Sequence, residues 1–444
     1  MKPRPAAGFL AGAASRLLPM SVPFRFFGAA VVFHFLAWLA LLAGADRFPR
    51  FGGGLGWPLA ALHLVTLGVL MMSALGASLQ LLPVATRQPV GRPGWPLLIW
   101  WLYTPGVALL TLGMGAALPA LLGLGALAVA AALALWALLL ASNLRRTRRA
   151  GGMNAVVAHG WAALAALVVM LASALALVGF HLGWPLAGRT APLALHVVFA
   201  AYGTMGLLGW GMSYILVPMF ALAVAPDERP ALASGALAVA ALALAALAAF
   251  GIAPQALRLA AIAFGSAAAA LHLHLMRQAL RSGIRQQLGR SMTLVRLGWV
   301  GLGASLVAAL AMVLDAPGAG WPGLFVLLLV GGWLLTFLLG ILQRILPFLA
   351  ATHASRGRRR APTASALSAA RPLAVHFACH LTALGGLALA IAEDSAAIAA
   401  LAAAIGAAGA LAFGGFFWLV LQRTRHQAPA AIQAPVGQEQ GTSP

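Results

Sequence analysis

The sequence predicts an all-α polytopic membrane protein with about twelve transmembrane helices in three four-helix units. The composition, a series of long apolar stretches and a threefold sequence repeat support this fold class. Hydrophobic residues make up 62% of the 444 residues and charged residues only 8%. A soluble protein of this size has too few polar residues to cover so much apolar surface.

The apolar stretches have the length of about 20 residues that a helix needs to cross the hydrocarbon core of a bilayer. Backbone polar groups in lipid are satisfied only in helices or closed barrels, and stretches this long predict helices. We expect spans at 22–44, 57–83, 96–117, 119–142, 155–179, 190–221, 231–250, 254–276, 293–314, 322–348, 372–392 and 396–422. The membrane domain thus covers 22–422, between an N-terminal segment, 1–21, and a polar tail, 423–444, expected to be disordered.

A pattern of two glycines and a proline recurs three times, in spans 2, 6 and 10. The second glycine follows the first by eight positions, and the proline follows the second glycine by seven. The copies are Gly68-Gly76-Pro83, Gly203-Gly211-Pro218 and Gly332-Gly340-Pro347. Eight residues are slightly more than two helical turns, so both glycines fall near one face. That face allows close approach of another helix or of a flat ligand, and the proline is expected to end or kink the span.

The basic residues lie mostly on one side of an even-numbered bundle. They occur before span 1 and after spans 4, 8 and 10, at Lys2, Arg4, Arg16, Arg145, Arg146, Arg148, Arg149, Arg277, Arg281, Arg285, Arg290, Arg356, Arg358, Arg359 and Arg360. The positive-inside rule therefore places both termini in the cytoplasm. The net charge of +21 fits loops that meet anionic lipid rather than nucleic acid.

Histidine is the main polar residue type inside the predicted spans, which contain no Asp, Glu or Lys. Neutral imidazole is the commonest protein ligand for metals and also binds haem iron. His63 and His196 lie about six residues inside the outer ends of spans 2 and 6, and His34 lies in the middle or outer half of span 1. These three side chains are candidate cofactor ligands in the outer half of the bundle. A hydrogen-bonded histidine in a helix interface remains the alternative for His63 and His196.

Two further histidines, His376 and His380, are four residues apart in span 11 and share a helix face. They are candidate metal ligands, with an interfacial pair facing water or lipid headgroups as the alternative. His272 and His274 are expected at the membrane interface. The single Cys379 excludes a thiolate metal cage.

His63 and His196 do not occupy equivalent positions in the repeat. His63 precedes its proline by 20 positions and His196 precedes its proline by 22. Two positions correspond to about 200° around an ideal helix, so the two side chains are not equivalent unless a bulge intervenes.

The three repeat blocks resemble segments of bacterial proteins related to haem–copper oxidase subunit I and to the NnrS family. The blocks are His63 to Val84, Gly206 to Phe220 and Gly340 to Phe348. The resemblance implies a bacterial inner-membrane protein that binds haem or a metal in a respiratory or nitrosative-stress role. In the oxidases, span 2 supplies a low-spin haem ligand, span 6 one copper ligand, span 7 two more and span 10 the remaining haem ligands. Only His63 and His196 match, so oxygen reduction, proton pumping and nitric oxide reduction are not expected.

The sequence therefore favours a non-catalytic membrane protein that binds haem b through His63 with His196 or His34. Two other functions remain open. A transporter also fits twelve spans, although the major facilitator fold has two six-helix halves. An accessory or assembly subunit without a ligand would use its glycine faces to pack against a protein partner.

The predicted topology can be tested with a reporter fused after Arg425. We expect cytoplasmic activity, because the arginine-rich loops hold both termini inside. Activity of a periplasmic reporter at that position would mean that at least one span is miscounted.

Overall fold

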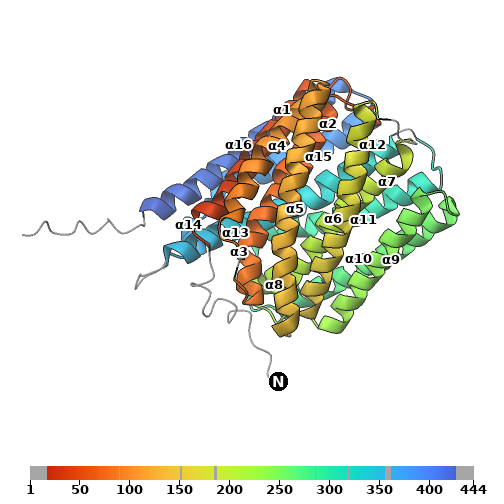
Figure 1. The fold of residues 1–444 in the computed structure, drawn as a ribbon. Helices are drawn as coiled ribbons and strands as arrows, with labels where there is room; N and C mark the ends of the chain where they lie inside the picture. The colour runs from red at the N-terminus through yellow and green to blue at the C-terminus, as the bar shows by residue number, and fades with distance from the viewer. Residues whose placement is uncertain are drawn as a thin grey trace, which may run out of the picture.

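The computed structural model describes residues 18–89, 91–150, 153–184, 188–285, 287–318, 320–355 and 362–426. The basic residues Lys2, Arg4 and Arg16, the arginines at 356 and 358–360 and the tail beyond His426 lie outside these ranges. Within them the chain is helical without β-strands, and twelve helical segments are long and apolar enough to cross a membrane. The predicted twelve spans are thus confirmed, and the chain is a multi-pass membrane protein (Figure 1).

Most spans are single α-helices that overlap the predicted stretches, although α5 and α10 continue eight and six residues beyond the predicted ends at 142 and 276. They are α1 (Ser21–Ala43), α4 (Trp95–Gly115), α5 (Pro119–Ala150), α6 (Asn154–His181), α9 (Glu228–Ala249), α10 (Pro254–Ser282), α11 (Gly289–Val313), α15 (Ala370–Ala392) and α16 (Ala396–His426). A short helix, α14 (Ala364–Leu367), precedes α15. Because α16 continues to His426, the first residues of the predicted tail are helical.

Spans 2, 6 and 10 share a composite construction of two α-helices joined by a π-helical segment. Span 2 is α2 (Trp57–His63), η3 (Leu64–Met71) and α3 (Met72–Thr86); span 6 is α7 (Thr190–Val198), η4 (Phe199–Gly206) and α8 (Leu207–Ala221); span 10 is α12 (Trp321–Val326), η5 (Leu327–Leu335) and α13 (Thr336–Ala354). Each π-helical segment contains the first glycine of the repeat. The sequence did not predict these segments, which are rare and often occur at functional sites.

The repeated prolines do not end their helices immediately. Pro83 and Pro218 lie inside the last turn of α3 and α8, and Pro347 lies inside α13. The expectation that they terminate the spans is therefore correct only to within a turn or two.

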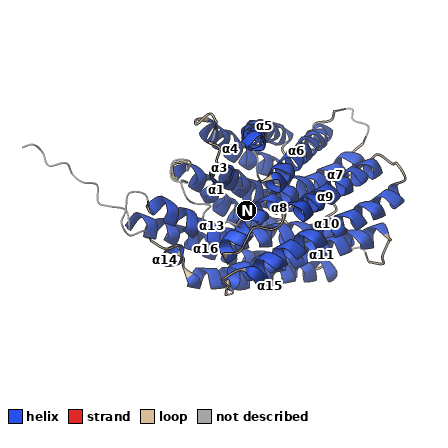
Figure 2. Cartoon of the chain, turned by 90° about the horizontal axis from the view of Figure 1, so that it is seen from below, coloured by secondary structure: helices blue, strands red, loops and turns tan. Residues whose placement is uncertain are grey.

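The helices pack in three rows of four neighbours, and each row ends in a composite span. One row runs from α15 through α16 and α1 to span 2, a second from α4 through α5 and α6 to span 6, and a third from α9 through α10 and α11 to span 10. Between the rows, η5 contacts both η3 and η4. Figure 2 views the bundle from below, with α4, α5 and α6 along one side and α9, α10 and α11 along another.

The repeated glycines mediate helix packing in each row. A methyl group on Gly68 would lie 2.6 Å from Cβ of Phe33 in α1, and one on Gly203 would lie 2.7 Å from Cβ of Ala166 in α6. The second glycines pack in the same way: a methyl group on Gly76 would lie 2.8 Å from Cβ of Phe26. Real Cβ atoms do not approach so closely, so these positions require glycine. Of the two roles considered for this face, the structure therefore assigns helix packing.

Large apolar side chains cover much of the outside of the bundle. Leu127, Val168 and Phe250 are each more than 60% exposed. Soluble proteins rarely expose so much apolar surface to water, and such a surface is typical of contact with lipid.

We call the two ends of the bundle the near end and the far end. The near end contains Ser21, where α1 begins, and His426, where α16 ends; the far end contains the loop after α1. Arg50 in that loop donates hydrogen bonds to Asp394 in the loop between α15 and α16, so an ion pair joins two loops there.

The packing predicts a strong difference between two glycines of α11. A methyl group on Gly301 would overlap the backbone of Gly332, whereas one on Gly303 would meet no atom within 4 Å. Gly301→Ala should lower the free energy of unfolding by about 1–3 kcal/mol, the usual cost of overpacking. Gly303→Ala should not lower it, because alanine is favoured over glycine by about 0.5–1 kcal/mol inside a helix. Thermal unfolding of the detergent-solubilised variants measures this difference, and equal stability of the two would contradict the packing.

Candidate functional site

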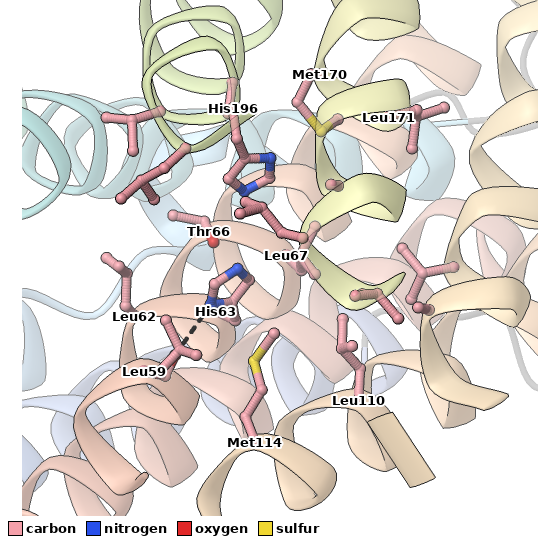
Figure 3. Close-up of a pocket in the computed structure, with 18 of the residues that line it drawn as sticks. Leu59, Leu62, His63, Thr66, Leu67, Leu110, Met114, Met170, Leu171 and His196 are labelled. Atoms are coloured by element: carbon pink, nitrogen blue, oxygen red, sulfur yellow. Dashed lines mark hydrogen bonds between the residues drawn. The ribbon is translucent and has the colours of Figure 1, made fainter. Parts of the chain in front are cut away.

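His63 and His196 meet in the far half of the bundle, as the sequence predicted. His63 is the last residue of α2, and His196 lies in α7, three residues before η4. Their ring centroids are 6.1 Å apart and the ring planes differ by only 13°. Figure 3 shows the two rings facing one another across a pocket.

The backbone fixes the orientation of the His63 ring. Its Nδ1 lies 3.0 Å from the carbonyl oxygen of Leu59, one turn earlier in α2. Because a carbonyl can only accept, Nδ1 carries the proton, and Nε2 is left with a free lone pair. His196 is less constrained: its Nδ1 is buried and makes no hydrogen bond of normal geometry, although Met170 of α6 lies beside the ring.

An apolar cavity of about 230 Å³ surrounds the two rings. Its wall consists mainly of leucine, alanine, valine and methionine side chains from spans 2, 3, 4, 5, 6 and 10. Thr66 and Thr204 are among its few polar residues, and the Thr204 hydroxyl is buried without a hydrogen-bond partner. We call this space the histidine cavity.

The far end of the histidine cavity is basic. Arg189, just before α7, lines it together with Gly53 and Gly54 of the loop after α1. A methyl group on Gly53 would lie 3.1 Å from Nη2 of Arg189. Both glycines have positive φ, 106° and 101°, a conformation that glycine adopts without strain. The loop therefore approaches the guanidinium closely.

His34 does not join this pair, contrary to the prediction that it could converge with His63 and His196. Its ring lies 6.1 Å from that of His376 in α15, and Trp38 Nε1 donates a hydrogen bond of 3.3 Å to its Nε2. The face of α1 that carries His34 therefore points toward α15 and away from the histidine cavity.

His376 and His380 are both buried, so the interfacial alternative for this pair is wrong. Their rings are 5.7 Å apart and nearly parallel. Thr336 donates its only hydroxyl proton to the Gly331 carbonyl at 2.7 Å, so it must accept from His380 Nε2 at 2.8 Å. The neutral His380 ring therefore keeps a lone pair on its buried Nδ1, which has no partner.

The partner of His376 gives this ring the opposite tautomer. The Gln343 amide donates to His376 Nδ1 at 3.4 Å, which leaves the proton on a buried, unpartnered Nε2. Both rings could ligate one metal ion only if the Gln343 amide turned so that its oxygen accepted from Nδ1. Among the described residues, no group of three or more His, Cys, Asp or Glu is arranged to hold a metal. The metal site at His376 and His380 stays a prediction.

A third histidine cluster, in the near half, was not predicted. His272 of α10 is fully buried, so the expectation that it lies at the interface is wrong. Its Nδ1 is 3.1 Å from the Tyr214 hydroxyl, and its ring stacks on Trp210 at 4.6 Å. His159 of α6 lies 5.3 Å from the Tyr214 ring, and its Nδ1 donates to the Ala155 carbonyl at 2.8 Å.

The repeat carried a signal for these near-half contacts. Tyr214 and Gln343 each follow the second repeated glycine by three positions, and Gln80 follows it by four. Each binds a histidine on another span: Tyr214 binds His272, Gln343 binds His376, and Gln80 lies 3.4 Å from His353. A polar residue after each second glycine therefore marks where composite spans contact histidines.

Comparison with known proteins finds no match for the chain, either among family models or among curated sequences.

Tyr214→Phe should leave His272 Nδ1 buried without a partner and lower the free energy of unfolding by about 1–3 kcal/mol. Removing both polar groups, in Tyr214→Phe with His272→Phe, should cost less than the two single changes together, because no unpaired polar atom remains. Thermal unfolding of the three variants measures the coupling, and strict additivity would contradict the hydrogen bond.

Proposed function

We propose that the protein is a bacterial inner-membrane haem b protein on an oxidase-like scaffold, with His63 and His196 as the two haem ligands. The observation that carries the proposal is the pairing of these imidazoles from different spans across an apolar cavity. A neutral imidazole with its Nδ1 held by a backbone carbonyl is the usual form of a metal-ligating histidine. His63 has this form.

The spacing of the two rings supports ligation of one metal centre between them. Imidazole nitrogens bind metals at about 2.0–2.1 Å. Two rings on opposite sides of one metal ion then have centroids roughly 6 Å apart, and the observed separation is 6.1 Å. A modest rotation of His196, whose Nδ1 has no fixed partner, would adjust its ring without moving the spans.

The lining of the cavity also fits haem, which has an apolar macrocycle and two propionate groups at one edge. Carbon-rich side chains surround the rings, and Arg189 stands at the far end, where it would pair with a propionate. A metal ion alone would not require so large an apolar wall. The combination of two histidines, an apolar cavity and one arginine therefore favours haem over a bare metal ion.

Ligation by both histidines would leave no axial position for a reacting molecule. The sequence has no histidine in α9, where the oxidases have copper ligands. We therefore propose electron transfer, sensing or haem delivery, with respiration or nitrosative stress as the setting that the resemblance implies. The packing of helices in rows of four supports this proposal over a transporter built from two six-helix halves.

The absorption spectrum of the purified protein, oxidised and reduced, tests the proposal. The wild type should show the Soret band of six-coordinate haem b. His63→Ala and His196→Ala should each lose most of the haem, whereas His274→Ala, at an exposed histidine that contacts Gln278, should keep it. His196→Met should retain haem with a raised midpoint potential, because Met/His ligation favours the reduced state.

The outcome that contradicts haem binding is equally clear. If wild-type protein made with ample iron contains no haem, or if His63→Ala keeps a normal content, the histidine cavity is not a haem site. The remaining function is then a ligand-free accessory or assembly subunit.

A further inference from the structure

Arginine is rare at the far end of the bundle. Only Arg47, Arg50, Arg189 and Arg258 lie at that end among the residues that the structure describes. Arg50 pairs with Asp394, and Arg47 lies 3.7 Å from Asp46. The other two have no ion pair with any acidic side chain in the described ranges. If the far end is the outer side, as the arginine distribution predicts, an unpaired arginine there needs a specific reason.

The two unpaired arginines share one feature: each lines an apolar cavity. Arg189 lines the histidine cavity. Arg258, in the second turn of α10, lines a second cavity of about 230 Å³ between spans 6, 7, 8, 9 and 10. The two cavities lie on opposite faces of α7, because His196 and Val197 line the first, whereas Leu195 and Val198 line the second.

The second cavity, which we call the slot, has the lining that a hydrocarbon chain needs. One wall is formed by small side chains, among them Ala241 and Ala245 of α9 and Gly265 of α10. Tyr202 and Trp333, whose rings are 5.5 Å apart, also line the slot. The Tyr202 hydroxyl already bonds Ser305 at 2.9 Å. The slot is therefore apolar, with a single charged group, Arg258, which is exposed.

We propose that the second cavity binds an anionic phospholipid, with one acyl chain in the slot and the phosphate at Arg258. The position of Arg258, one turn from the far end of α10, corresponds to the depth at which a bilayer presents phosphate groups. An uncharged occupant such as a quinone or a neutral lipid would fill the slot equally well, but it would give Arg258 no counter-ion. Charge complementarity therefore selects the anionic lipid.

This lipid site does not depend on haem, because the histidine cavity and the second cavity use different faces of span 6. A bound acyl chain would lie against α9, α10 and α11 and add packing contacts to all three. We therefore expect the lipid to stabilise the third row of the bundle.

Native mass spectrometry of the protein purified in a mild detergent tests the proposal, with phosphatidylglycerol as the added probe and phosphatidylcholine as its neutral counterpart. Wild type should retain about one phosphatidylglycerol per chain and show a higher thermal unfolding temperature when it is added. Arg258→Gln should reduce retention at least tenfold. Arg290→Gln, which removes the same charge from an exposed position at the near end, should not.

A second pair of variants tests the slot without changing charge. A side chain at Gly265 has room to grow, since its nearest neighbours would be 3.8 Å from Cβ, and it would enter the slot. Gly265→Leu should therefore expel the acyl chain, whereas Gly303→Leu, outside the slot with no atom within 4 Å of its Cβ, should keep the lipid.

Three results would overturn the proposal. They are equal retention of phosphatidylglycerol in wild type and Arg258→Gln, equal retention of the two lipids by wild type, and displacement of phosphatidylglycerol by an uncharged quinone with no effect of Arg258→Gln. Haem content is measured in the same samples. If Arg258→Gln loses phosphatidylglycerol but keeps its haem, the lipid site is supported independently of the haem site. If the wild type retains phosphatidylglycerol but contains no haem, only the proposed function is contradicted.

Discussion

Close contact between the composite spans and their neighbours is the interaction on which the rest of the structure depends. Lipid provides no hydrophobic drive for one helix to join another, so helices in a membrane associate through tight packing and a few polar contacts. Gly68 and Gly203 bring η3 and η4 against α1 and α6 at distances that no larger residue permits. In the third row the requirement for glycine falls on the neighbouring helix: a methyl group on Gly301 of α11 would overlap the backbone of Gly332, whereas one on Gly332 would have no neighbour closer than 3.7 Å.

The π-helical segments occupy the same region of each composite span as the first repeated glycine. They change the winding of the helix at the first repeated glycine, and so they set the rotation of every side chain beyond it. In span 10, Thr336 bonds the Gly331 carbonyl of η5 and at the same time orients His380. In span 2, His63 is the last residue before η3. Local changes of winding thus lie next to buried histidines, including the proposed haem ligand His63.

Polar groups are few in this bundle, and they are used differently in its two halves. In the far half, two histidines face an apolar cavity with nitrogens left over for a ligand. In the near half, Tyr214 and Gln343 use hydrogen bonds to hold histidines within helix interfaces. An unpaired polar atom in an apolar interior costs free energy, so the near-half contacts stabilise the bundle, and the far-half pair gains most from binding a partner.

The sequence by itself determined the twelve spans, their limits and the threefold glycine spacing, because the thickness of the bilayer and the bulk of a side chain act on local sequence. It also indicated that His63 and His196 lie at similar depth. Only the tertiary structure decided which histidines meet. The two-position offset between His63 and His196 corresponds to about 200° of helix rotation, and the sequence does not contain the rotation of each span. That rotation comes from packing against neighbouring helices, and it turns His196 toward His63, His34 toward His376, and Arg258 toward a cavity formed by five different spans.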